Sequence, residues 1–253
     1  MAADSWSSPP RLIGGRVAAS PVADNRLLAW LLPADLAILK PHLEPVELKL
    51  RQKLEEPNRR IEHVYFPEHG FASVVARQHP ESMEVGLIGR EGMTGLAVVL
   101  DDTQSPLDTF VQSAGHGLRM PAPALREAMQ NSQSLAKSLR RSAHCFLVQA
   151  GYAALINGRY KLEERLARWL LMAQDRLRGD ELALTHEFLS IMLGVRRAGV
   201  TIALNILQQR GIIRHGRGKV MILDRPALLR VSNNSYGGPE AELERLFTRR
   251  QAT

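Results

Sequence analysis

The 253-residue sequence contains a single cysteine, Cys145. One thiol cannot form a disulfide within the chain, and it cannot supply the ligands of a four-cysteine iron–sulfur or zinc site. The eight histidines are scattered without the spacing of metal ligands. We therefore expect no metal and no other cofactor, and a reducing cytoplasm is the simplest location.

Long apolar runs are also missing. No stretch approaches the roughly 20 apolar residues that a membrane span needs. The N-terminus lacks the basic start and apolar stretch of a secretory signal. We expect a cytoplasmic protein without membrane contact.

Catalytic motifs are absent as well. The sequence has no G-x-S-x-G, no H-E-x-x-H and no G-x-x-x-x-G-K-[ST]. An enzyme with a metal-binding cupin-like barrel would need clustered His and Glu on adjacent strands, and this pattern is missing. The sequence therefore predicts a protein that is not an enzyme.

Short strands with alternating polarity fill residues 46–120, among them 61–66 and 71–76 with turn residues between them. They indicate an antiparallel β-barrel or jelly roll. Helical periodicity dominates the rest, so the predicted fold class is α+β. We expect five segments: a disordered tail (1–24), a β-barrel domain (25–130), a dimerisation helix (131–158), a winged helix-turn-helix domain (159–236) and a C-terminal extension (237–253).

One long helix is predicted over residues 132–157, ended by Gly158. Its apolar residues are three or four positions apart and form a narrow seam, which is typical of a two-stranded coiled contact. We interpret the seam as a dimer contact, although packing on the chain's own barrel is compatible with the same pattern. The seam residues are Leu135, Leu139, Ala143, Phe146, Ala150 and Ala153.

The stretch over residues 184–223 has the layout of a winged helix-turn-helix. Thr185 is a favourable N-cap for a helix over 186–193, and Gly194 ends it because glycine adopts positive φ without strain. A second helix is predicted over 196–209. Two strands, 212–214 and 219–223, would then form the wing around a loop with glycine and positive charge.

The second helix carries the side chains that read base edges in a major groove. Residues 185–230 hold eight Lys or Arg against two acidic residues, a concentration of positive charge that favours DNA. The predicted base-reading residues are Arg196, Arg197, Thr201 and Asn205. The predicted phosphate contacts are Thr185, His186, Arg214, Arg217 and Lys219.

A glycine-rich turn lies between two predicted strands, at residues 89–95. Backbone amides of such a turn can bind a phosphate, although a simple tight turn is the alternative interpretation. The candidate effector pocket consists of Gly89, Arg90, Glu91, Gly92 and Thr109.

Three stretches together resemble the Crp/Fnr family of bacterial transcription regulators. They are residues 89–93 in the barrel, 162–170 after the long helix, and 184–189 with 193–197 in the helix-turn-helix. The resemblance covers about residues 27–230 and implies a cyclic-nucleotide-binding-like barrel. It also implies a homodimer on a near-palindromic double-stranded operator, with one recognition helix per major groove. RNA polymerase is a further candidate partner, and the small-molecule effector is unknown.

The resemblance also implies what individual residues do. Arg197 matches the family's base-reading arginine and is expected to donate to a guanine. Ala198 and Ile202 replace the glutamate and second arginine of the cyclic-AMP-responsive members, so their operator should not be read. Leu107 and Asp108 replace the Arg-Ser pair that holds the cyclic phosphate, and the aspartate is expected to repel a phosphate. Arg90 replaces the ribose-binding glutamate. Cyclic AMP is therefore not expected to bind.

An alternative function is a ligand-binding regulatory protein that acts through protein partners, with a winged helix that no longer reads DNA. The concentration of positive charge argues against it, because a partner-binding winged helix has no need for eight basic residues.

Overall fold

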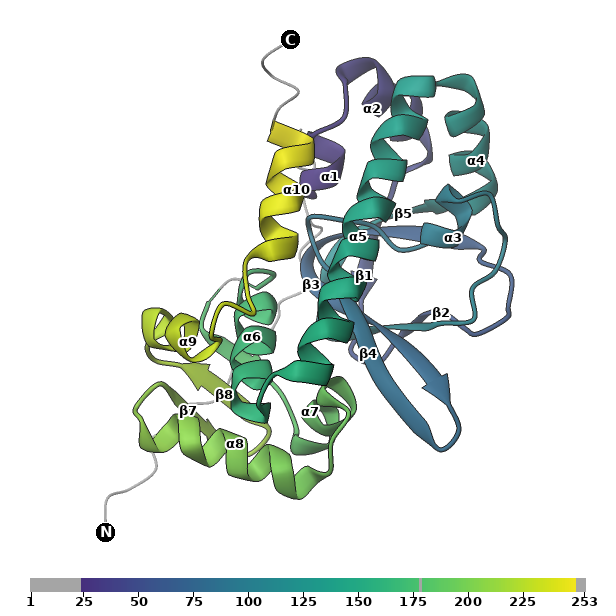
Figure 1. Ribbon diagram of the computed structural model, residues 1–253. Coiled ribbons are helices and arrows are strands. Elements are labelled where there is room, and N and C mark those ends of the chain that lie inside the picture. Colours follow the sequence, from purple (N-terminus) through teal and green to yellow (C-terminus); the bar gives the residue numbers. More distant parts are fainter. Residues whose placement is uncertain (1–23, 178, 249–253) are drawn as a thin grey trace, which may run out of the picture.

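The computed structural model describes residues 24–177 and 179–248. The predicted disordered tail lies outside the described residues except for Asp24. The described chain forms an N-terminal domain built on one antiparallel sheet, a long helix, and a C-terminal helical domain with a small second sheet (Figure 1). This confirms the predicted fold class.

The N-terminal sheet has the strand order β1-β5-β3-β4, and β2 pairs with β5. In the described residues it does not close into a barrel, which corrects the closed form expected from the sequence. The strands are β1 (Glu44–Leu48), β2 (Lys53–Glu55), β3 (His63–Gln78), β4 (Glu81–Ile88) and β5 (Asp108–Pro121).

Strand β3 joins two strands that the sequence predicted separately, 61–66 and 71–76. The register against β5 shifts between Pro67 and Ala72, so the expected turn is an irregular stretch of one continuous strand. Gly70 permits it, because its φ is +77° and a Cβ there would lie 2.4 Å from the Ser113 carbonyl oxygen.

The N-terminal domain also contains several short helices, and one long helix follows them. They are α1 (Arg26–Ala29), α2 (Pro33–Leu39), the 3₁₀ turn η1 (Lys40–His42), α3 (Leu96–Val99), α4 (Ala122–Asn131) and α5 (Gln133–Arg159). Ser132 caps α5 by accepting a hydrogen bond from the Leu135 amide at 3.2 Å. The predicted break at Gly158 is wrong, because α5 continues to Arg159.

The predicted dimer seam on α5 faces its own chain. Leu135 and Leu139 are fully buried in the core of the N-terminal domain, together with Ala143. Ala153 is 9% exposed, and Phe146 and Ala150 line a cavity under the helix. The structure therefore corrects the seam: four of its six residues are buried within the chain, Phe146 and Ala150 are half-buried at the cavity, and a different face of α5 is exposed.

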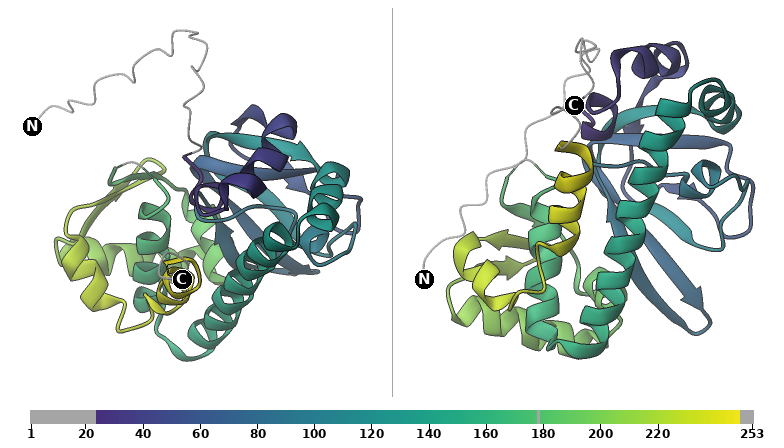
Figure 2. Two further views of the ribbon diagram at one scale, coloured as in Figure 1. Left: turned by 90° about the horizontal axis from the view of Figure 1, so that it is seen from above. Right: turned by 45° about the horizontal axis from the view of Figure 1, so that its top comes forward.

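The C-terminal domain contains α6 (Leu162–Gln174), β6 (Glu181–Ala183), α7 (His186–Leu193), α8 (Arg197–Gln209), β7 (Ile213–Gly216), β8 (Lys219–Ile222) and α9 (Arg225–Val231). It packs on the N-terminal sheet through α6 and α7, beside α5 (Figure 2). The Phe71 and Trp169 rings meet edge to face at 6.2 Å, and Trp169 Nε1 donates to Glu84 at 2.7 Å. The two domains thus share one apolar core.

The C-terminal extension forms α10 (Gly238–Thr248), which lies along α5 and reaches α1 (Figure 1). Phe247 stacks on Trp30 with ring centroids 4.4 Å apart, and Glu244 pairs with Arg26. The sequence left open whether the extension stays loose or packs on a partner. The structure packs it on its own N-terminal domain.

Within the described chain, no single helix is long and apolar enough to cross a membrane. Helices α7 and α8 have the length and apolar composition of a membrane span only when they are added together, and the chain bends by 103° at their junction.

Candidate nucleic-acid interface

Helices α7 and α8 form the predicted helix-turn-helix. The Thr185 hydroxyl accepts from the Phe188 amide at 3.2 Å, which confirms the predicted cap. Gly194 ends α7 with a φ of 59°, also as predicted. The angle of 103° between the two helices suits a helix-turn-helix, in which it is roughly 90–120°.

Helix α8 has one buried and one outward face. Val200, Ala203, Leu204 and Leu207 are at most 2% exposed and hold the helix on the domain core. The opposite face carries the predicted base-reading residues. Arg196 lies at the N-cap, Arg197 and Asn205 are exposed, and Thr201 is half-buried.

Three of these side chains are held by neighbours that sequence reasoning did not pair with them. Arg197 forms an ion pair with Glu187 on α7, with 2.8 Å between Nη2 and Oε2. The Thr201 hydroxyl lies 3.0 Å from His186 Nδ1, and Asn205 Oδ1 lies 3.0 Å from His215 Nε2. The outward face therefore has side-chain partners within its own domain.

Two histidines connect this face to the wing. The His186 and His215 rings are 5.8 Å apart. Burial, with a smaller contribution from the neighbouring His186, lowers the pKa of His215. The neutral ring is therefore favoured, and in it a protonated Nε2 can donate to the Asn205 amide oxygen.

The wing is the hairpin β7–β8. Its tip is shorter than the predicted loop, because His215 and Gly216 belong to β7 and only Arg217 and Gly218 make the turn. Both turn residues have positive φ, 48° and 78°, which suits a two-residue hairpin. A third strand, β6, was missed by sequence reasoning. It pairs with β8, and Glu181 lies 2.7 Å from Lys219 Nζ.

The predicted phosphate-contacting residues lie at the start of α7 and on the wing, and the wing turn approaches α7 because Gly218 lies beside Thr185. Thr185 and His186 begin α7, and Arg214, Arg217 and Lys219 are exposed on the wing. Their contacts with DNA stay a prediction.

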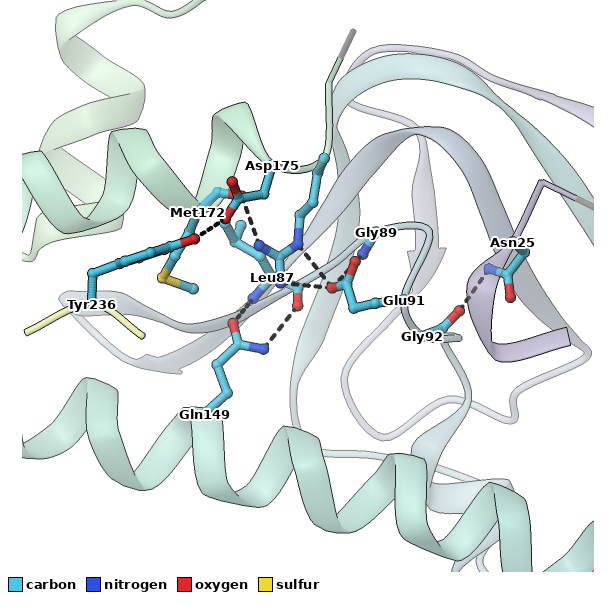
Figure 3. A network of polar contacts seen from close by, with 10 residues as sticks. Asn25, Leu87, Gly89, Glu91, Gly92, Gln149, Met172, Asp175 and Tyr236 are labelled. Carbon is cyan, nitrogen blue, oxygen red and sulfur yellow. Dashed lines mark hydrogen bonds and ion pairs between the residues drawn. The ribbon is translucent and has the colours of Figure 1, made fainter. Parts of the chain in front are cut away.

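The predicted effector pocket at residues 89–92 does not form as a set. Glu91 is paired with the buried guanidinium of Arg176, with 2.6 Å between Oε1 and Nη2, and it accepts from the Gly89 amide at 3.2 Å (Figure 3). Asn25 Nδ2 donates to the Gly92 carbonyl at 3.0 Å. The Arg90 carbonyl accepts from the Arg26 amide at 2.6 Å. This turn is a contact between α1, the sheet and the end of α6, and only Thr109 of the predicted set lines a large cavity.

Asp108, expected to repel a phosphate, is itself neutralised. It is 2% exposed and pairs with Lys53 and with Arg77, whose Nη2 lies 2.7 Å from Oδ2. Because it neighbours Thr109 along β5, its side chain lies on the opposite face of the sheet.

The large cavity lies between the sheet and α5 and has a volume of about 590 Å³. Residues from β2, β3, β4, α3, β5 and α5 line it, so no single motif could have revealed it from the sequence. No group of three His, Cys, Asp or Glu within residues 24–177 and 179–248 could hold a metal ion.

Comparisons with known proteins confirm the resemblance. Residues 164–231 match the family described as the Crp-like helix-turn-helix domain. A protein from Eubacterium rectale described as a Crp/Fnr transcriptional regulator aligns with a TM-score of 0.65 at 18% identity, over 82% of this chain and 98% of its own. FixK2 from Bradyrhizobium japonicum aligns at 0.64 and 18%, over 75% and 96%.

A Crp/Fnr-family regulator from Thermus thermophilus aligns with a TM-score of 0.60 at 20% identity, over 76% of this chain and 100% of its own. At these identities the likeness shows the fold. No curated protein sequence matches the chain significantly.

Proposed function

Since the chain has the fold of Crp/Fnr transcription regulators and carries a Crp-like helix-turn-helix domain, we propose that it regulates transcription by reading a specific DNA sequence as a homodimer. The observation that carries the proposal is the outward face of α8. It presents an arginine, a threonine and an amide in one row, each four residues from the next and each held by a neighbour. In a major groove an arginine can donate to guanine, a threonine can contact the backbone or a thymine methyl group, and an asparagine amide can pair with adenine.

The wing and the start of α7 supply the phosphate contacts of this proposal. Arg214, Arg217 and Lys219 give the wing positive charge beside the row on α8. Such contacts position the domain on the duplex without selecting a sequence, and they make affinity depend on salt.

The homodimer would use the free face of α5 instead of the buried seam. Leu147 and Leu155 are 68% and 54% exposed, and Gly151 lies midway between them. A Cβ at Gly151 would meet nothing within 4 Å, so a second helix can approach closely there. Two α5 helices crossing at this row would set two recognition helices on two half-sites of a near-palindrome.

Selection of bound sequences from a random duplex library tests the proposal. Wild-type protein should enrich a near-palindromic motif. Arg197→Ala should lower affinity for that motif by about 1–3 kcal/mol and relax the base preference at one position in each half-site.

Arg59→Ala is the matched control, because Arg59 is also an exposed arginine paired with a glutamate, but it lies in the N-terminal domain. It should leave the motif unchanged. An unchanged motif with Arg197→Ala would show that α8 does not read bases. Salt-sensitive binding without any enriched motif would contradict sequence-specific reading by the unliganded protein.

Cyclic AMP is not the proposed effector. The residues at the positions of the family's phosphate-binding pair are Leu107 and the ion-paired Asp108. Addition of cyclic AMP should leave DNA affinity unchanged, and a shift in affinity would contradict this part of the proposal.

A further inference from the structure

The cavity between the sheet and α5 has the size of a small-molecule site. Its volume of about 590 Å³ lies within the roughly 300–1,000 Å³ of such sites. Helix α5 covers it on one side, and β2, β3, β4 and β5 form the other. Of the sixteen residues that line it, eleven are apolar. An apolar body can therefore fill most of it.

The interior offers little to a polar ligand. Glu55 and Thr109 are its deep polar residues, 8% and 1% exposed. Glu55 already accepts from the Gly95 amide at 2.8 Å, and its burial raises the carboxyl pKa. Of the lining residues only Arg140 is a Lys or Arg, and it is exposed. A phosphate buried beside Glu55 would therefore lose its hydration without gaining a basic partner.

Positive charge is found at the edge formed by α5. Arg140 and His144 are exposed lining residues, and a shallow basic groove continues along the helix with Lys137 and Arg141. Glu242 of α10 approaches His144 at 3.4 Å, so Arg140 is the stronger candidate for an anionic group. Leu100 and Leu147, 65% and 68% exposed, also line the cavity.

From this arrangement we infer that the cavity binds an amphipathic monocarboxylate, with its apolar chain or ring between the sheet and α5 and its carboxylate at Arg140. Burial of the chain supplies affinity, and the charged edge selects the head group. The inference does not depend on DNA binding.

Isothermal titration of the full-length protein with butanoate, hexanoate, octanoate and decanoate tests the part of the cavity that binds the apolar chain of the ligand. Affinity should rise by roughly tenfold for each two added methylene groups until the cavity is filled. Cyclic AMP should neither bind nor compete. Equal affinity for all four acids, or competition by cyclic AMP, would overturn the inference.

Two variants separate the parts of the site. Arg140→Gln should weaken decanoate by about tenfold or more and leave decanol unchanged, because only the head-group contact is lost. Ala150→Phe places a ring in the cavity and should abolish binding of both. Arg126→Gln, on α4 outside the cavity, is the charge-matched control.

Arg140 is exposed, so its variant tests the site even where Ala150→Phe does not fold. Equal loss of decanoate and decanol with Arg140→Gln, or no loss of decanoate, would refute the head-group assignment. Because these titrations contain no DNA, their failure is distinct from failure of the proposed regulator function.

Discussion

The carboxyl of Glu84 should make the stability of the whole molecule depend on pH. It lies on β4, 6% exposed, where the N-terminal sheet meets the C-terminal domain. Trp169 Nε1 of α6 donates to it at 2.7 Å and the Ser73 hydroxyl of β3 at 2.5 Å. Burial raises its pKa from 4.5 to about 7, although both hydrogen bonds and the charges of Arg168 and Arg176 act in the opposite direction.

The direction of the effect follows from proton linkage. Between pH 4.5 and about 7 the folded protein binds the Glu84 proton more tightly than the unfolded chain does. The unfolding free energy therefore falls as the pH rises through this window. At about 1.36 kcal/mol per pH unit, the interval from 4.5 to about 7 corresponds to at most about 3.4 kcal/mol.

Glu84→Gln removes the ionisation and keeps the shape of the side chain. The amide can still accept from one donor, and it can donate to the Ser73 hydroxyl, so we expect an intrinsic cost of about 1 kcal/mol. The variant should be the less stable protein near pH 5 and the more stable one near pH 8.

Urea unfolding followed by tryptophan fluorescence between pH 5 and 8 measures this difference. Histidines that titrate in this window affect both proteins alike, so the difference between the two curves isolates Glu84. Glu81→Gln, at an exposed position on the same strand, should run parallel to wild type. Parallel curves for wild type and Glu84→Gln would refute the reasoning.

Three further predictions concern the dimer, the reading face and the turn. Leu155→Glu places a charge on the free face of α5 and should weaken dimerisation by at least about tenfold in sedimentation experiments. The control Leu229→Glu, at 48% exposure on α9, should leave dimerisation unchanged. Equal effects of the two variants would contradict the proposed interface. His215→Ala frees the Asn205 amide and should lower base discrimination at one operator position by about 1 kcal/mol in competition binding. Lys219→Ala should weaken binding to all DNA sequences alike and flatten its salt dependence. A uniform loss of affinity with His215→Ala would count against a positioning role for His215. Gly194→Ala should destabilise the protein by about 1–2 kcal/mol in urea unfolding, because φ at this position is 59°. A Cβ there would also lie 2.3 Å from Met83 Cε, so Met83→Ala in the same chain should recover part of the loss. Stability of Gly194→Ala equal to that of wild type would refute the strain.

Local chemistry made the helix-turn-helix predictable. Helix α7 begins after Thr185 and ends before Gly194, as expected from the capping chemistry of these two residues. The periodicity of the apolar residues in α8 identified its buried face. These signals act within a few residues, so they survive without knowledge of the fold. The same holds for the β7–β8 hairpin, whose glycine-containing turn is a local feature.

The errors arose where distant segments meet. Helical period alone shows that α5 has an apolar seam, but not whether a partner or its own sheet covers it. The turn at residues 89–92 resembled a phosphate-binding loop. The sequence did not show that Glu91 is already paired with Arg176, because the two residues are 85 positions apart in the chain. The Gly70 stretch looked like a turn between two strands, and pairing with β5 made it part of one strand.

The sequence by itself determined the fold class, the bounds of the helix-turn-helix and the residues that α8 turns outward. Caps, glycine conformations and apolar periods set these features within single elements. The tertiary structure alone decided which face of α5 remains free, where α10 packs, how Glu84 is buried and what lines the cavity. These features depend on which surfaces far apart in the chain exclude water from one another, and burial of that kind is not encoded in any one segment.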